Sequence, residues 1–508
     1  MARVPNEYVV GERSVTFAAL ARGRFAREAL LPWFFVGVFV LSVPLGVWAR
    51  SPELIVTGAV LGVAGVLLFS APFGVRPLYQ RLLDVVRWRA LARGGELRYS
   101  SASGFAGLEG GRHAPGRPPS AFGRITWRDV PVALGRAGAG GDVCVFFQPE
   151  AGGGGHYGVS VQVDAAWGGL PDVLRSDRLR GGLSRALGQL SDSFDRVAMY
   201  SVCSYTDVSA LPPPSAGAPA SFRAAVEASR DDAAAHPSYE HFLTLWATSS
   251  APLRAAARQA RARGESDPHL AAARVVAARL EAAVPLLAAA EVVVRRPLAA
   301  QALAGVNRGL LDRSVSLWDD APTDPSRMAP PMEVHPTHVG VHGRHGDGFL
   351  RGFEVAGFTD EVRTSASLVP LHTLGAAVRG RTLEYVTAVV VDVRGRVATL
   401  NEAQRHEQGA ELRRQVREST SHLRASLDRP ADERQHNVSY AGGGWHGGYG
   451  AGFFVVNAAS LDELDADCEA LVAAARGCGV HLAPVAALRQ DQAVVAGTLL
   501  GRGLARVL

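Results

Sequence analysis

Two long apolar runs close to the start of the chain dominate its hydrophobic pattern. Residues 29–49 and 54–75 contain no charged side chain, and only the four residues 50–53 separate them. Because a helix rises about 1.5 Å per residue, each run would reach about 30 Å, the thickness of the hydrocarbon core of a bilayer. The pattern therefore predicts a transmembrane hairpin of two antiparallel helices.

Arginines flank both ends of this predicted hairpin, whereas its short turn contains only Arg50. Cytoplasmic flanks of membrane spans carry an excess of basic residues. We therefore expect a multi-pass protein of the inner membrane with both termini cytoplasmic, a basic N-terminal tail over residues 1–28, and membrane lipids as partners. The flanking residues on which this depends are Arg24, Arg27, Arg76, Arg81, Arg87 and Arg89. A cleaved signal peptide is the competing interpretation, but it leaves the second apolar run unexplained.

Small residues recur on one side of the second apolar run. Gly58 and Gly62 form a G-x-x-x-G pair, and Gly65 lies on a nearby face. Such glycines let two helix backbones approach closely. We expect them to pack against the first helix of the hairpin, and a helix of another chain is the alternative partner.

The rest of the chain alternates between strand and helix patterns, which indicates an α+β fold. Residues 76–141 are expected to form a basic juxtamembrane helix and a loop. Two open-faced α+β sandwiches follow, over residues 142–317 and 348–508, with a connector at 318–347 that is rich in proline, histidine and glycine. Strands are predicted at 124–134, 143–148, 157–163, 197–205, 239–248, 292–294, 348–356, 365–370, 383–393, 452–457 and 480–483. Helices are predicted at 177–191, 221–234, 268–289, 400–427, 461–476 and 490–500.

The composition excludes several kinds of chemistry. All 53 basic residues are arginine, and no lysine occurs. Phosphate-binding loops and Schiff-base enzymes both require a lysine, and arginine cannot replace its amine. The net charge of +5 is small for 508 residues, so we expect no direct binding to nucleic acid. The four cysteines lack paired spacing and are interpreted as core residues in a reducing compartment.

Two polar segments resemble binding sites but are better explained otherwise. Four histidines lie close together in the sequence: His335, His338, His342 and His345. The intervening Pro336, Gly340 and Gly343 oppose a helix that would align these histidines on a metal. A polar loop is therefore favoured. The glycine-rich segment 439–453 lacks the lysine of a phosphate-binding loop and is predicted to be a flexible surface loop.

Neither a zinc-protease helix nor a nucleophile elbow is found in the sequence. His406 and Glu407 begin a partial match to H-E-x-x-H, but the second histidine is missing. In the segment 400–427 arginines alternate with glutamates, which indicates a solvated face. The sequence therefore predicts no catalytic residue, cofactor or metal site.

Three features of the chain are the predicted hairpin, the segment GHYGVSVQVD at 155–164 and the segment ALRQDQAVVAGTLLGRGL at 487–504. In these features the chain resembles an actinobacterial membrane-protein family encoded with conjugative elements. The resemblance implies a subunit of a type IV secretion-like DNA-transfer apparatus, similar to the non-motor N-terminal part of the conjugative ATPase. It implies a scaffold that docks a separate motor ATPase and other secretion subunits and forms a homo-oligomer. A type VII secretion component and a membrane-anchored enzyme remain as alternatives.

Overall fold

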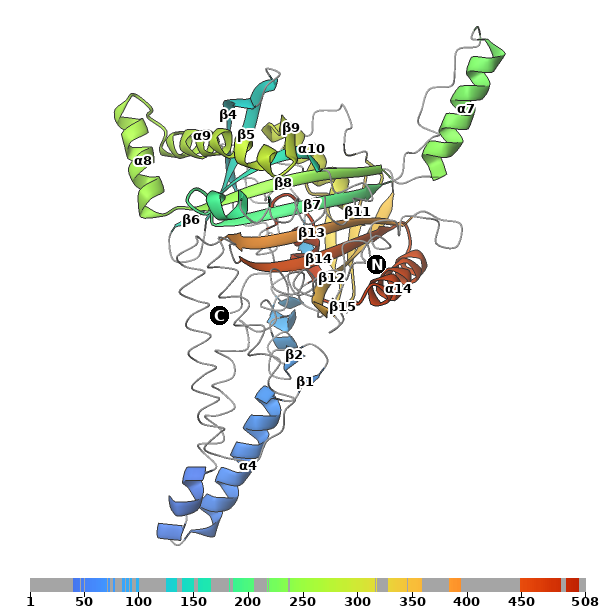
Figure 1. Ribbon diagram of the computed structural model, residues 1–508. Coiled ribbons are helices and arrows are strands. Elements are labelled where there is room, and N and C mark those ends of the chain that lie inside the picture. Colours follow the sequence, from blue (N-terminus) through green and yellow to red (C-terminus); the bar gives the residue numbers. More distant parts are fainter. Residues whose placement is uncertain are drawn as a thin grey trace, which may run out of the picture.

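The computed structural model is built around one 13-stranded antiparallel sheet (Figure 1). Its central path runs through β3 (Arg98–Tyr99), β10 (Met332–Val334), β11 (Val339–His342), β12 (Asp347–Phe358), β14 (Gly448–Ala458), β13 (Glu384–Val393), β7 (Arg196–Ser204), β8 (Ser238–Thr248), β6 (Gly155–Ala165), β5 (Ala139–Pro149) and β4 (Thr126–Leu134). Two more strands pair beside this path, β15 (Val480–Pro484) with β12 and β9 (Val292–Pro297) with β6.

The helices are α4 (Pro52–Ser70), α7 (Ala220–Ala235), α8 (Ala251–Ala262), α9 (Pro268–Ala289), α10 (Ala300–Leu311), α14 (Leu461–Gly477) and α15 (Gln490–Ala496). A separate two-stranded hairpin pairs β1 (Pro72–Phe73) with β2 (Arg76–Pro77). The structure describes residues 40–45, 47–49, 51–70, 72–73, 76–77, 85–86, 88–90, 92–93, 97–99, 125–134, 139–149, 154–165, 182, 186–204, 217, 219–235, 238–315, 317, 328–344, 346–358, 383–393, 448–485 and 490–501.

The two halves of the sheet repeat one arrangement. In the first half the order is β4, β5, β6, β8, β7, with β9 beside β6; in the second it is β10, β11, β12, β14, β13, with β15 beside β12. A helix, α9 or α14, comes directly before the sixth strand of each half, and another, α10 or α15, comes after it. The fold is therefore an internal duplication.

The two copies meet at their equivalent strands, β7 and β13. These strands pair antiparallel over eight residue pairs, from Tyr385 opposite Cys203 to Asp392 opposite Arg196. An antiparallel pair of equivalent strands is related by a local two-fold axis, so the halves are related by approximate two-fold symmetry through this ladder.

Helices cover both faces of the sheet. Successive side chains of a strand point to opposite faces, and on β7 the side chains of Ala198 and Tyr200 belong to the core beneath α10 and α15. On the opposite face Val197 belongs to the core beneath α8 and α9, and Cys203 to the core beneath α14. All four cysteines are free and buried, which confirms their interpretation as core residues.

The predicted pair of separate, open-faced sandwiches is wrong. The edge strands β7 and β13 would each leave a row of backbone N–H and C=O groups unpaired, and they satisfy these groups by pairing with each other. A single sheet results, and each of its faces carries a hydrophobic core. Sequence patterns record which face a residue occupies but not which edge its strand joins.

The predicted transmembrane hairpin and the multi-pass inner-membrane location with both termini cytoplasmic are contradicted. Within the described ranges, no helix combines the length and the apolar character needed to cross a bilayer. Helix α4 stops at Ser70 and the chain then enters the hairpin β1–β2, so the uncharged part of this helix, 54–70, is only about 26 Å long. Of the first predicted span, only 40–45 and 47–49 are described.

Individual elements were predicted more accurately than their assembly. Helix α9 begins at Pro268 and ends at Ala289, as predicted, and the predicted helix 461–476 corresponds to α14. The sequence reasoning missed α8, α10, β10 and β11. The predicted strand 365–370 and helix 400–427 lie outside the described residues.

Candidate functional site

Helix α8 is held to the body of the protein by one apolar edge. Ser250 precedes the helix and its hydroxyl accepts a hydrogen bond from the amide of Leu253, at 3.5 Å, which marks the helix start. Leu253 and Ala257 are one helical turn apart and are buried in the same core as α9. The opposite side of α8 therefore points away from the sheet.

Four arginines on this helix and at its end are exposed. Arg254, Arg258 and Arg261 follow each other at helical spacing, and Arg263 comes directly after the last helical residue. We call these four residues the arginine face. No aspartate or glutamate occurs in the sequence from residue 241 to residue 264, so its arginines are not balanced by any acidic residue of the same segment.

The guanidinium groups of the arginine face are not neutralised by their described surroundings. Arg254 donates from Nη1 to the backbone oxygen of Ser249 at 2.6 Å, and Arg258 donates from Nε to the backbone oxygen of Arg254 at 3.3 Å. In the part of the chain that the structure describes, none of the four forms an ion pair with a carboxylate. Their charges are therefore available to a partner.

The acidic residues that follow α8 are already engaged. Glu265 forms an ion pair with Arg274, with 2.9 Å between Oε2 and Nη1, and Asp267 forms one with Arg128, with 2.8 Å between Oδ2 and Nε. Asp267 also accepts a hydrogen bond from the amide of His269 at the start of α9. These contacts hold the acids beside α9 rather than on the arginine face.

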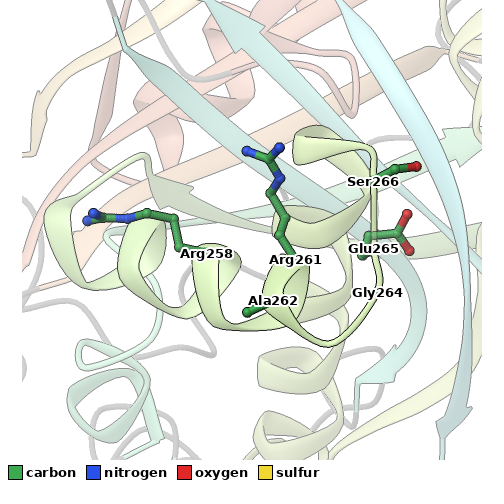
Figure 2. Close-up of a pocket in the computed structure, with 6 residues that line it drawn as sticks. All are labelled: Arg258, Arg261, Ala262, Gly264, Glu265 and Ser266. Atoms are coloured by element: carbon green, nitrogen blue, oxygen red, sulfur yellow. The ribbon is translucent and has the colours of Figure 1, made fainter.

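A shallow hollow of about 490 Å³, open to solvent, lies at the turn between α8 and α9. Gly264 makes this turn with φ of +112°, a conformation that favours glycine. Figure 2 shows Arg258 and Arg261 extending from α8, while Glu265 and Ser266 lie on the turn that follows. The hollow presents guanidinium groups on a rigid helix, an arrangement that binds carboxylates or phosphates through charge-assisted hydrogen bonds.

Helix α8 has no counterpart in the second half. There, β14 ends at Ala458 and α14 begins at Leu461, whereas in the first half α8 stands between β8 and α9. The duplicated fold therefore closes without such a helix. Because α8 is additional to the duplicated unit and has an exposed charged side, it is the element of the first half best suited to bind a partner.

The glycines predicted to pack helices all lie on the buried side of α4. Gly58, Gly62 and Gly65 are buried, and a Cβ atom added at Gly58 would clash with the side chain of Ser42. Gly58 therefore allows close approach of the segment 40–45, part of the first apolar run.

The predicted flanking arginines do not form one site. Arg76 pairs through its backbone with Phe73 in the hairpin β1–β2, and Arg89 lies exposed in a short helical segment. Arg24, Arg27, Arg81 and Arg87 lie outside the described residues.

The histidine-rich segment contains a stacked pair of rings. His335 and His338 lie with their ring centroids 4.5 Å apart, and His338 also contacts Phe349 edge-on. Burial lowers the pKa of His338, and the neighbouring His335 and Arg351 lower it further. Among the described residues, which exclude His345, no group of three or more metal-ligating side chains could hold an ion.

Sequence reasoning missed the arginine face because it did not predict α8. The signal was present: Ser250 and Pro252 form a helix start, and the arginines at 254, 258 and 261 have the spacing of one helix side. The high alanine content of this segment weakened its contrast between apolar and polar sides.

Comparison with known protein families and with characterised proteins finds no match to this chain.

Proposed function

We propose that this protein is a scaffold subunit of a conjugative, type IV secretion-like apparatus, in which it docks a separate motor ATPase. The observation that carries the proposal is the arginine face of α8, whose four guanidinium groups lack a described carboxylate partner. The helix has no counterpart in the second half. This face is the contact through which the subunit is held in its assembly.

The chemistry of the arginine face suits a protein contact. Arginine is enriched in protein interfaces because its planar guanidinium group binds carboxylates in a fixed geometry and stacks on apolar groups. The buried Leu253 and Ala257 fix α8 on the body, so a partner meets a pre-arranged surface. Less conformational entropy is then lost on binding.

The link to a secretion apparatus rests on the sequence resemblance. Of the three features that carry it, the predicted hairpin is contradicted, and the other two are the segments 155–164 and 487–504. The described parts of these two segments meet at Thr244 of β8. The hydroxyl of Thr244 is 2.8 Å from the hydroxyl of Ser160 and donates to the backbone oxygen of Leu499 at 3.2 Å. The C-terminal one of these segments therefore belongs to a core that residues of both halves share.

Copurification from the native host tests the proposal. The tagged protein is isolated in mild detergent, and its partners are identified by mass spectrometry, alongside a variant with Arg254→Gln, Arg258→Gln, Arg261→Gln and Arg263→Gln. A matched control, with Arg223→Gln on α7 and Arg476→Gln on α14, removes exposed arginines elsewhere.

We expect a conjugative motor ATPase to copurify with the wild type and with the control, but not with the α8 variant. Recovery of type VII secretion components would overturn the assignment to a conjugative apparatus. Isolation of a lone chain from the wild type would overturn the scaffold function altogether.

A further inference from the structure

Helix α14 carries the charge opposite to that of α8. Asp462, Asp465 and Glu469 are exposed and share one side of the helix, at spacings of three and four residues. We call these three residues the acidic face. Asp465 pairs with Arg351 at 2.7 Å, yet its side chain stays 61% exposed. Leu461, 41% exposed, adds an apolar contact at the start of the same helix.

The helical part of the arginine face matches the acidic face in length. Arg254 to Arg261 and Asp462 to Glu469 each cover seven residue steps, which is about 10 Å along a helix axis. One face presents only positive groups and the other presents carboxylates. Two helices laid side by side would therefore place opposite charges along the full contact.

The faces cannot meet within one molecule, because α8 and α14 lie at opposite ends of the protein, α8 beyond the first half of the sheet and α14 beside the second (Figure 1). A contact between them must join two molecules. It would be heterologous, since different surfaces meet, and the joined pair would keep one arginine face and one acidic face free for further copies.

We infer that copies of this chain associate head to tail, with the arginine face of α8 on one copy seated against the acidic face of α14 on the next. This inference rests on the proposed function, because it names the partner that the arginine face meets in the scaffold. A repeated contact of this kind builds a ring or a filament on which motor subunits are docked.

Charge reversal tests the contact on the full-length protein. One variant carries Arg254→Glu, Arg258→Glu and Arg261→Glu, and a second carries Asp462→Arg and Glu469→Arg but keeps Asp465 and its pairing with Arg351. Sedimentation velocity in mild detergent measures association, and the detergent shields the exposed apolar side chains of α4. The control is Arg223→Glu on α7.

We expect the wild type and the control to associate at about 0.05 M salt and to dissociate toward monomer at about 0.5 M, because salt screens exposed charges. Each reversal variant alone should associate at least about tenfold more weakly. An equimolar mixture of the two should regain association, since every contact in the mixture again joins opposite charges. Recovery in the mixture also shows that both variants are folded.

A monomeric wild type at low salt, or a mixture that fails to regain association although both variants unfold at the wild-type temperature, overturns the head-to-tail contact. If the arginine face is still needed for copurification of the motor ATPase in that case, the proposed function stands and only its self-association is lost.

Discussion

Gly352 of β12 shows how one missing side chain sets the position of a helix. A Cβ atom added there would clash with Ala493 of α15. The side chain of Gln490, at the start of the same helix, accepts from the amide of Gly352 at 2.9 Å and donates to the backbone oxygen of Val485 at 3.1 Å. Close approach and buried hydrogen bonds together fix α15 on the sheet.

We therefore predict that Gly352→Ala destabilises the protein by about 1–3 kcal/mol, the usual cost of overpacking a core. Urea unfolding measures this loss. Gly348→Ala on the same strand is the control, because the nearest atom to its added Cβ lies 3.7 Å away. Combining Gly352→Ala with Ala493→Gly should recover part of the loss, and equal effects at Gly352 and Gly348 would contradict this account.

At the scale of a single element, Asp267 fixes the start of α9. Its carboxylate accepts from the amide of His269 at 2.8 Å and pairs with Arg128 of β4 at the same distance. Partial burial opposes the charged form, but the hydrogen bonds from Arg128 and from the amides of His269 and Leu270 outweigh it and lower the pKa of Asp267. The charged carboxylate thus ties the helix to the edge of the sheet.

Asp267→Ala should therefore cost about 1 kcal/mol of stability at neutral pH, as expected for the loss of an N-cap. Because the folded protein holds this pKa below its usual value, the contribution is complete above about pH 4 and declines as the pH falls through the lowered value. Urea unfolding of the wild type and the variant across pH 2.5–7 measures the difference. A difference in the free energy of unfolding that grows in acid would contradict this role of the Asp267 carboxylate. Gln259→Ala on α8 is the control.

Residues at the end of the second half form hydrogen bonds with the first half. These bonds connect the two halves of the molecule. The backbone oxygens of Leu499, Leu500 and Gly501 accept hydrogen bonds from Thr244, Gln148 and Tyr200. In the same place the amide of Leu499 donates to Oδ1 of Asn307, on α10, at 2.8 Å. Together with the ladder between β7 and β13, these contacts connect both copies of the duplicated unit.

We accordingly predict that Asn307→Leu destabilises both halves together. Leu499 would lose its buried acceptor, at a cost of about 1–3 kcal/mol. Calorimetry of the wild type and the variant should each show one transition, shifted to lower temperature in the variant. Two resolved transitions, of which only one shifts, would show that the halves unfold independently. Asp142→Asn, at an exposed position of β5, is the control.

Periodicity predicted most of the long strands and the helices α9 and α14, because their side chains repeat at the spacing of a buried face. It failed for β10 and β11, which have three and four residues, too few for a period to be recognised. It also missed α8, so the arginine face was not among the predicted site residues. The apolar runs at 29–49 and 54–75 predict membrane spans because composition alone does not show where a helix ends.

The sequence by itself determined the alternation of strands and helices, the burial of the four cysteines and the absence of lysine chemistry. Local spacing and composition carry that information. Only the tertiary structure decided that the two units duplicate each other, that β7 and β13 join them into one sheet, and that α8 and α14 carry opposite charges at opposite ends. Edge pairing and the relative position of surfaces depend on contacts between residues about 190 apart, such as Met199 and Val389, which no local pattern encodes.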